Sequence, residues 1–201
     1  MKRLFLLFFI VATTVAAKAQ EEAEDNKGDD HMVFNPEVGL NATQYTGYGN
    51  NFRLGYTLAA HFRLGTDFYI QAGAAFTKYA VNTDVHTDDT SYVAGTFSDI
   101  SSYYVQFPLM AGFKLVNLEH LNFRVAGGYV PSIYMGSDIR NATISREDFK
   151  RTTHALRVGI GMDVLILTLN AYYDWGVTDV FAQPKNVTYQ QLTLAAGIRI
   201  F

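Results

Sequence analysis

The stretch Phe52–Leu64, FRLGYTLAAHFRL, decides the fold class of this chain. Side chains of a β-strand point alternately to its two faces, so a strict period of two predicts a strand with one apolar and one polar face. In this stretch the even positions are apolar, and four of the odd positions between them are polar, namely Arg53, Thr57, His61 and Arg63.

The same alternation recurs in seven more segments, and the connections between the segments alternate in length. The predicted strands are 33–45, 52–64, 67–81, 100–116, 119–135, 152–166, 168–179 and 188–201. Short turns fall at Gly65-Thr66, at Asn117-Leu118 and at a reversal near Leu167. The longer loops are 46–51, 82–99, 136–151 and 180–187.

Short turns on one rim and long loops on the other are typical of outer-membrane barrels, whose short turns are periplasmic. We therefore predict an all-β fold over residues 33–201, an eight-stranded antiparallel up-and-down transmembrane β-barrel in the cell outer membrane. Its even strand number puts both termini on the periplasmic side.

The first residues predict export. Lys2 and Arg3 precede the apolar run Leu4–Val15, and Ala17-Lys18-Ala19 is a small-x-small cleavage site, so we predict a signal peptide over residues 1–19. The run is shorter than the about 20 residues that a membrane-spanning helix needs. The chain contains no cysteine, which excludes a lipoprotein anchor and disulfides.

Removal of the signal peptide leaves 13 Lys plus Arg against 19 Asp plus Glu, a formal net charge of −6. This balance argues against a nucleic-acid partner. Much of the acidity lies in Glu21–Asp30 (EEAEDNKGDD), and we interpret residues 20–32 as an acidic disordered lead-in to the first strand.

The composition of the two strand faces indicates which one meets lipid. One face carries large apolar residues such as Phe68, Phe113 and Ile160, while the other mixes charges with glycines. In a soluble lipocalin-like barrel the apolar face would point inward. An eight-stranded barrel has room inside only for side chains, and a charge facing lipid costs about 2–4 kcal/mol at the midplane. The apolar face is therefore predicted to face lipid.

The interior charges form either a solute path or a structural network, and they are Glu37, Arg53, Arg63, Lys114, Arg124, Arg157, Asp163, Asp174 and Arg199. Buried charges are costly unless paired, so we expect Arg157 or Arg124 to pair with Asp163 or Asp174. We favour a plugged, salt-bridged lumen over an open channel, because pores need about 16 strands. The predicted lumen charge network is Arg53, Arg124, Arg157, Asp163, Asp174 and Arg199.

Aromatic residues predict two membrane-interface belts. One belt lies toward the loops and the other near the short turns. The loop-end belt is Tyr45, Tyr48, Tyr79, Tyr103, Tyr134, Trp175 and Tyr189, and the turn-end belt is Phe62, Phe68, Phe113 and Phe123.

Candidate chemistry is sparse, and we predict a non-enzymatic protein without catalytic, cofactor-binding or metal sites. His154 and Ser101 could approach the loop rim, but they have no obvious paired acid. Asp84, His86, Asp88 and Asp89 could gather a divalent cation, yet a solvated acidic loop explains them better. Loop 136–151 mixes both charge signs and is interpreted as an exposed, partner-binding loop.

As an ordered series, these segments resemble the outer-membrane β-barrel family of Bacteroidetes, also called porin-family or PorT-family proteins. The resemblance is carried by Gly39-Leu40-Asn41, Tyr104–Leu109 (YVQFPL), Gly127-Gly128-Tyr129, Tyr172–Asp179 (YYDWGVTD) and a Gly-x-Arg-x ending. This chain departs from the family pattern in its last strand. Related chains have an aromatic residue at the last position that faces lipid, and this chain has Ile200 there.

Two functions remain open from the sequence. The first is a surface, scaffold or interaction barrel whose loops 82–99 and 136–151 contact proteins or glycans. The second, implied by the PorT resemblance alone, is an accessory role in type IX protein secretion. The expected partners are outer-membrane lipid and, during biogenesis, the barrel-assembly machinery.

Overall fold

The computed structural model describes residues 32–46, 53–83, 97–118, 121–139, 149–181 and 187–200. The predicted signal peptide and most of the lead-in lie outside these residues. Among the described residues, no helix is long and apolar enough to cross a membrane. The strands are β1 (Met32–Tyr45), β2 (Arg53–Gly65), β3 (Phe68–Thr83), β4 (Phe97–Gln106), β5 (Leu109–Leu118), β6 (Leu121–Ile139), β7 (Thr152–Val164), β8 (Leu167–Gly176) and β9 (Tyr189–Ile198).

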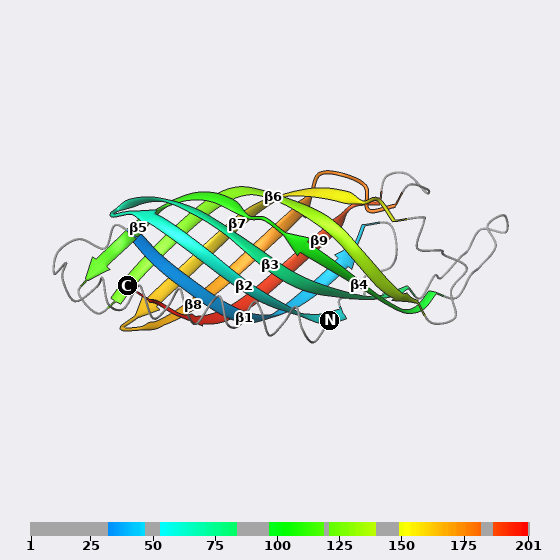
Figure 1. Ribbon diagram of the computed structural model, residues 1–201, viewed down its shortest axis with the longest axis horizontal. Helices are drawn as coiled ribbons and strands as arrows, with labels where there is room; N and C mark the ends of the chain where they lie inside the picture. The colour runs from blue at the N-terminus through cyan, green and yellow to red at the C-terminus, as the bar shows by residue number, and fades with distance from the viewer. Residues whose placement is uncertain are drawn as a thin grey trace.

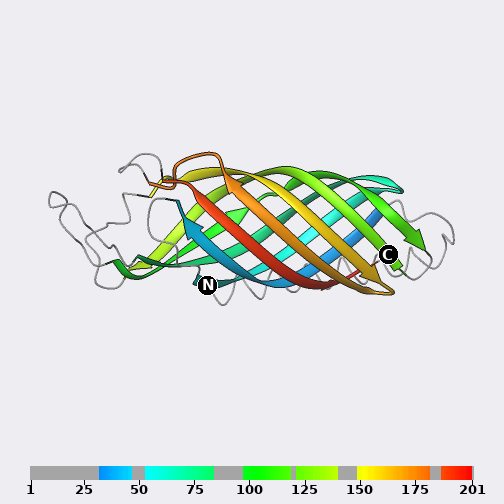
Figure 2. The ribbon, with the colours of Figure 1, turned by 180° about the vertical axis from the view of Figure 1, so that it is seen from behind.

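These strands form one closed antiparallel sheet, which confirms the predicted barrel (Figures 1 and 2). Strands that follow each other along the chain pair with each other, except β4 and β5, and β9 returns to β1 with the register Leu40↔Leu194. β4 and β5 are two parts of one wall, because both lie between β3 and β6. The barrel therefore has eight walls.

The break between β4 and β5 falls at Phe107-Pro108. Proline has no N–H and cannot donate to a sheet. The neighbouring strands bridge the break, since the Phe107 N–H donates to the Pro131 carbonyl at 2.9 Å and the Gly73 N–H donates to the Pro108 carbonyl at 3.1 Å. The ladder of hydrogen bonds is therefore interrupted at Phe107-Pro108, but the wall continues from β4 into β5.

β3, β4 and β6 extend further at the loop end than the alternation predicted, whereas β8 ends at Gly176 instead of 179. β6 runs to Ile139 instead of 135, and β4 begins at Phe97 instead of 100. Thr83 pairs with Phe97, and Ile100 pairs with Ile139. Parts of the predicted loops 82–99 and 136–151 therefore belong to the sheet, while residues 84–96 and 140–148 lie outside the described residues.

The short turns gather at the opposite rim. β2 and β3 are joined at Gly65, whose φ of 121° favours glycine, and β7 and β8 are joined through Leu165 at φ 54°. β1 also begins at this rim, because Met32 pairs with Leu64 at the end of β2. The end of the molecule at the left of Figure 1 is therefore the predicted periplasmic end.

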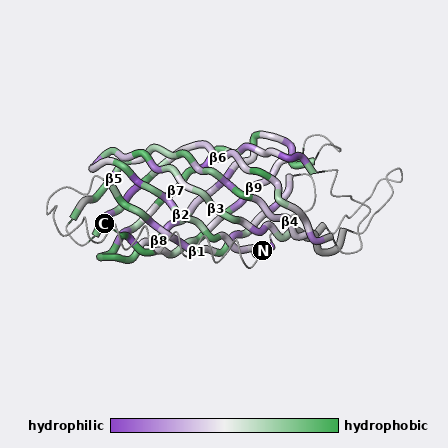
Figure 3. The backbone as a smooth tube through the Cα atoms, in the orientation of Figure 1, coloured by the Kyte–Doolittle hydropathy of each residue, from purple (hydrophilic) through white to green (hydrophobic). Residues whose placement is uncertain are grey.

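The two strand faces have the predicted orientation. Leu54 and Ile160 point outward with exposed fractions of 73% and 64%, while Thr57 and His61 point inward at 6% and 1%. Hydropathy alternates along the strands in Figure 3. An apolar outer surface around a polar interior is the arrangement that a lipid bilayer requires of a barrel.

The aromatic prediction was right for one belt and wrong for much of the other. Phe62, Phe68, Phe113 and Phe123 are exposed on the outer face near the short turns, as predicted. In contrast, Tyr45, Tyr79 and Tyr189 are each at most 2% exposed and point into the lumen. In their strands these tyrosines occupy the alternate positions that face the lumen, so they fill the barrel and do not contact lipid. Trp175 does lie on the outer face, at 43% exposure.

Candidate functional site: the filled lumen

A buried charge cluster crosses the lumen toward the short-turn end. Asp163 on β7 accepts from Arg63 Nη1 at 2.9 Å and from Arg124 Nη1 at 2.8 Å. All three side chains are at most 4% exposed. β2 and β7 lie on opposite walls in the strand order, so the Arg63–Asp163 ion pair spans the barrel.

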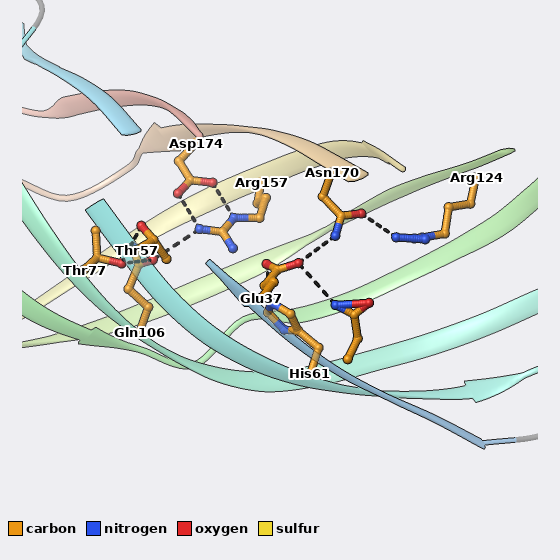
Figure 4. A network of polar contacts seen from close by, with 10 residues as sticks. Glu37, Thr57, His61, Thr77, Gln106, Arg124, Arg157, Asn170 and Asp174 are labelled. Carbon is orange, nitrogen blue, oxygen red and sulfur yellow. Dashed lines mark hydrogen bonds and ion pairs between the residues drawn. The ribbon is translucent and has the colours of Figure 1, made fainter. Parts of the chain in front are cut away.

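The cluster continues through an amide to a second carboxylate (Figure 4). Arg124 Nη2 donates to the Asn170 side-chain oxygen, and Asn170 Nδ2 donates to Glu37 Oε2 at 2.6 Å. The other oxygen of Glu37 lies 2.9 Å from His61 Nε2. One connected chain of polar groups thus joins β6, β8, β1 and β2.

A second ion pair lies nearer the middle of the barrel (Figure 4). Arg157 donates to both oxygens of Asp174, from Nε at 2.6 Å and from Nη2 at 2.7 Å. Such bidentate pairs are strong and geometrically specific. Arg157 Nη2 also reaches Gln106 Oε1 at 3.3 Å, and the guanidinium lies 4.9 Å from the ring centroid of Tyr172.

Hydroxyl groups extend this second cluster around the wall. Gln106 Oε1 accepts from Thr77 Oγ1 at 3.2 Å, and Gln106 Nε2 donates to Tyr79 Oη at 2.7 Å. The hydroxyls of Thr77 and Thr57 lie 3.2 Å apart, and Thr57 accepts from Asn41 Nδ2 at 3.1 Å. Hydrogen bonds between side chains therefore connect four successive walls, β4, β3, β2 and β1.

Inward glycines make room for these long side chains. A Cβ on Gly161 would lie 2.6 Å from the Arg124 guanidinium, and a Cβ on Gly73 would lie 2.2 Å from His61 Nδ1. Both distances are too short for real contacts. The mixture of glycines and charges noted in the sequence is thus a packing requirement of a narrow lumen.

The loop end of the lumen is filled differently, by a cluster that we call the aromatic plug. Its members are at most 6% exposed, and they are Tyr45, Tyr79, Tyr104, Val130, Phe149, Ala155, Val180, Phe181, Val187 and Tyr189. The Tyr79 ring lies 4.7 Å from that of Tyr104 and 5.4 Å from that of Tyr189, measured between centroids. These contacts close the cross-section with apolar surface.

Two loop segments complete the plug from above. Phe149 and Phe181 form an isolated antiparallel bridge, and their ring centroids are 4.9 Å apart. Lys150 N–H donates to the Val180 carbonyl at 2.9 Å, and Lys150 Nζ contacts Asp179 at 3.2 Å. The prediction that loop 136–151 is exposed was therefore wrong for its end, because Phe149 is buried.

Four of the six predicted network residues are brought together. Arg157 pairs with Asp174 and Arg124 with Asp163, two of the pairings that were expected. Arg53 and Arg199 are half-buried at the two ends of the barrel. The sequence analysis counted Glu37 and Arg63 among the interior charges but not in the predicted network. It missed His61, Asn170 and Gln106, although their inward parity was a usable signal.

Among the other sequence candidates, His154 and Ser101 do not come together in the structure. His154 Nδ1 lies 2.6 Å from Tyr129 Oη, with the two rings stacked at 5.6 Å. Ser101 on β4 is separated from His154 on β7 by β6. The four residues Asp84, His86, Asp88 and Asp89 lie outside the described residues. Within the part of the chain that is described, no group of three or more His, Asp or Glu could hold a metal ion.

A closed barrel with an apolar outside and an interior filled by side chains is the architecture of small outer-membrane barrel proteins. The family model for the outer membrane protein beta-barrel domain matches residues 19–182, and the chain belongs to this family. The protein is thus an outer-membrane barrel. No curated protein matches the chain.

Two solved structures show the same fold. Neisserial surface protein A (NspA) is 12% identical with a TM-score of 0.52, and the match covers 87% of this chain and 100% of that one. The outer membrane protein OprG from Pseudomonas aeruginosa is 10% identical with a TM-score of 0.52, covering 84% of this chain and 95% of that one. At these identities the likeness establishes the fold alone.

Proposed function

We propose that this protein is a non-enzymatic, non-conducting outer-membrane barrel that acts through its loop end as a surface, scaffold or interaction protein. The observation that carries the proposal is the double filling of the lumen. The Arg63–Asp163 ion pair crosses the lumen in one half, and the aromatic plug closes the other. Because the lumen is filled in both halves, the rim at the loop end is the part of the barrel that can contact other molecules.

The rim supports this proposal by its construction. β3, β4 and β6 extend the sheet at the loop end, and they carry the connections 84–96 and 140–151. Functional residues of rigid scaffolds concentrate on such loops. One of the two similar structures is named a surface protein. The proposed partners of this protein are outer-membrane lipid and, during biogenesis, the barrel-assembly machinery.

Conductance tests the closed lumen. The purified protein in planar bilayers should show no stable porin-sized conductance, because side chains fill an eight-stranded barrel. The double variant Phe149→Ala/Phe181→Ala should also remain closed, since the Arg63–Asp163 and Arg157–Asp174 pairs persist. Sustained passage of sugar-sized solutes by the parent protein would overturn the proposal.

Surface exposure and contact test the loop end. A short epitope after Asn141 should be detected on intact cells, whereas the same epitope after Thr66 in a short turn should appear only after cells are broken. A photo-crosslinker at Thr143 should capture a specific partner in intact cells, and one at Thr66 should not capture it. Reversed accessibility would contradict the proposed orientation.

A second candidate is an accessory role in type IX secretion. It is supported by the ordered motifs that resemble the PorT family, among them Tyr104–Leu109 and Tyr172–Asp179. Fold-level likeness alone does not assign a function. Deletion of the gene should then leave type IX cargo inside the cell while other outer-membrane barrels assemble normally. Unchanged cargo secretion would eliminate this candidate and leave the first intact.

A further inference from the structure

The turn between β7 and β8 is made of apolar residues that face outward. Residues 164–167 have the sequence VLIL, and in chain order their side chains are 37%, 61%, 67% and 57% exposed. Turns between strands ordinarily carry glycine, asparagine, aspartate or serine. The turn between β2 and β3 at the same rim follows this rule, with Gly65, Thr66 and Asp67. The β7–β8 turn is therefore unusual in composition, and Figure 3 shows it as a hydrophobic end of the barrel at the lower left.

The backbone of this turn does not favour its side chains either. Leu165 has a φ of 54°, in the left-handed region that a bulky residue rarely adopts. In the β2–β3 turn the residue with positive φ is Gly65, which adopts such a conformation without a steric penalty. A strained residue of this kind points to a contact that favours its side chain. The contact in question is one that accepts an exposed leucine.

The apolar turn continues the lipid-facing surface of the barrel without a break. Leu121 on β6 pairs with Val164 on β7, which pairs with Leu167 on β8. Leu167 pairs in turn with Ile198 on β9. The row lies on the outer face, where Val164, Leu167 and Ile198 are each at least 37% exposed. The surface that contacts lipid along the strands therefore extends to the turn itself.

Two further features suit surroundings without water. A backbone group that enters lipid needs a hydrogen bond within the protein, and the Ile166 carbonyl accepts one from the Arg199 N–H at 2.7 Å. The charged residue that precedes the turn, Asp163, points into the lumen, where it is 2% exposed and lies between Arg63 and Arg124. Residues 164–167 themselves offer apolar area and no charge.

From the composition, the backbone and the continuity of this surface we propose that the β7–β8 turn is inserted into the lipid leaflet at the short-turn end and anchors that side of the barrel. Its partner is the acyl-chain region of the phospholipids, because apolar surface without charge gains free energy by leaving water. The β2–β3 turn carries Asp67 and stays in water. This inference is independent of the proposed surface function, because it concerns the opposite rim.

Fluorescent labels on the two turns test the insertion. The chain contains no cysteine, so one introduced cysteine can carry an NBD label. Ile166→Cys and Thr66→Cys are labelled in phosphatidylcholine nanodiscs, both faces of which are open to solvent. Nitroxide groups on the acyl chains should quench the label on Ile166→Cys and not the label on Thr66→Cys. Iodide should quench the label on Ile166→Cys roughly three to ten times less, because an anion enters apolar surroundings only at a high cost.

A polar version of the turn tests whether its side chains hold it in lipid. Leu165→Asn/Ile166→Ser removes both apolar tips, and asparagine tolerates the positive φ, so the turn can still form. The label is placed on Leu167→Cys with and without these changes. Acyl-chain quenching should fall by roughly half in the polar version, since membrane contact scales with buried apolar area. The control Thr66→Ser should leave it unchanged, and each barrel is verified by its heat-dependent shift on gels.

Three results would overturn the proposal. The first is iodide quenching that is equally strong for the labels on Ile166→Cys and Thr66→Cys. The second is acyl-chain quenching that Leu165→Asn/Ile166→Ser does not change, because the strands alone would then set the depth of the turn. The third is shielding from iodide that appears only when a periplasmic extract is added, because a protein would then cover the turn instead of lipid.

Discussion

The two halves of the lumen are filled by opposite chemistry. The short-turn half holds charged groups in direct contact, with Asp163 between two arginines and Glu37 between His61 and Asn170. The loop-end half holds the aromatic plug, in which tyrosine and phenylalanine rings pack face to face and edge to face. The two halves therefore depend on different parts of the chain.

The charged half depends on barrel closure, because its partners come from different walls. The aromatic plug depends on the loops, because Phe149, Val180, Phe181 and Val187 lie beyond the strand ends. The lumen of a narrow barrel can thus be filled by side chains of its strands or by residues of its loops. Three pairs of substitutions probe this division, from the largest expected effect to the smallest.

The charged half should be the more sensitive to loss of a single group. Asp163→Asn leaves Arg63 and Arg124 buried without a counter-charge, and we expect it to lower the free energy of unfolding by about 3–5 kcal/mol. Urea unfolding in lipid vesicles measures this, with the single tryptophan, Trp175, as the fluorescent probe on the outer face.

The control is a carboxylate in a more exposed pair. Asp179 contacts Lys150 at 3.2 Å, and their side chains are 24% and 39% exposed. Asp179→Asn should change the free energy of unfolding by less than about 1 kcal/mol. Equal effects of the two variants would show that the lumen charges are hydrated, and the contrast between the halves would fail.

The aromatic plug should lose stability through lost burial. Phe181 is 3% exposed, and its ring lies 4.9 Å from that of Phe149 and 5.7 Å from that of Tyr45. Phe181→Ala should cost roughly 2–3 kcal/mol, below the usual range for a core phenylalanine because a loop relaxes more easily than a strand. Phe181→Leu should lose less than about 1.5 kcal/mol. If both variants unfold like the parent, the loops do not support the plug.

Two stacked tyrosines lie at the boundary between the charged half and the aromatic plug, and they test where the polar contacts end. Tyr79 Oη accepts from Gln106 at 2.7 Å, whereas the hydroxyl of Tyr104 has no hydrogen-bond partner among the described residues. Tyr79→Phe should therefore cost about 0.5–1.5 kcal/mol, and Tyr104→Phe should cost about zero. The same urea unfolding measures both, and a larger loss for Tyr104→Phe would move the boundary between the halves toward the loops.

The period of two predicted the walls and most inward residues, because strand geometry alone decides which face a side chain occupies. That is why Arg124, Arg157, Asp163 and Asp174 were recognised as interior groups. Parity also marked Tyr45 and Tyr189 as inward, but composition favoured an interface belt. The error came from treating all tyrosines near the loops as amphipathic anchors.

The ion pairs could not be predicted from the alternation of residues. The alternation shows which face of the sheet a side chain occupies, but not its position along the barrel axis. Height depends on strand tilt and stagger, which are set by the closure of the whole sheet. Arg63 and Asp163 meet from positions that are 100 residues apart. The inward turn of Phe149 was also hidden, since a loop residue has no periodicity to report its direction.

The ion pair between Arg63 and Asp163 has a kinetic consequence. Its members stand on opposite walls, so the contact forms only when the cylinder has closed and the last strands have paired. A contact absent from the folding transition state affects the unfolding rate and leaves the folding rate nearly unchanged. We therefore expect this pair to slow the unfolding of the completed barrel without speeding its assembly.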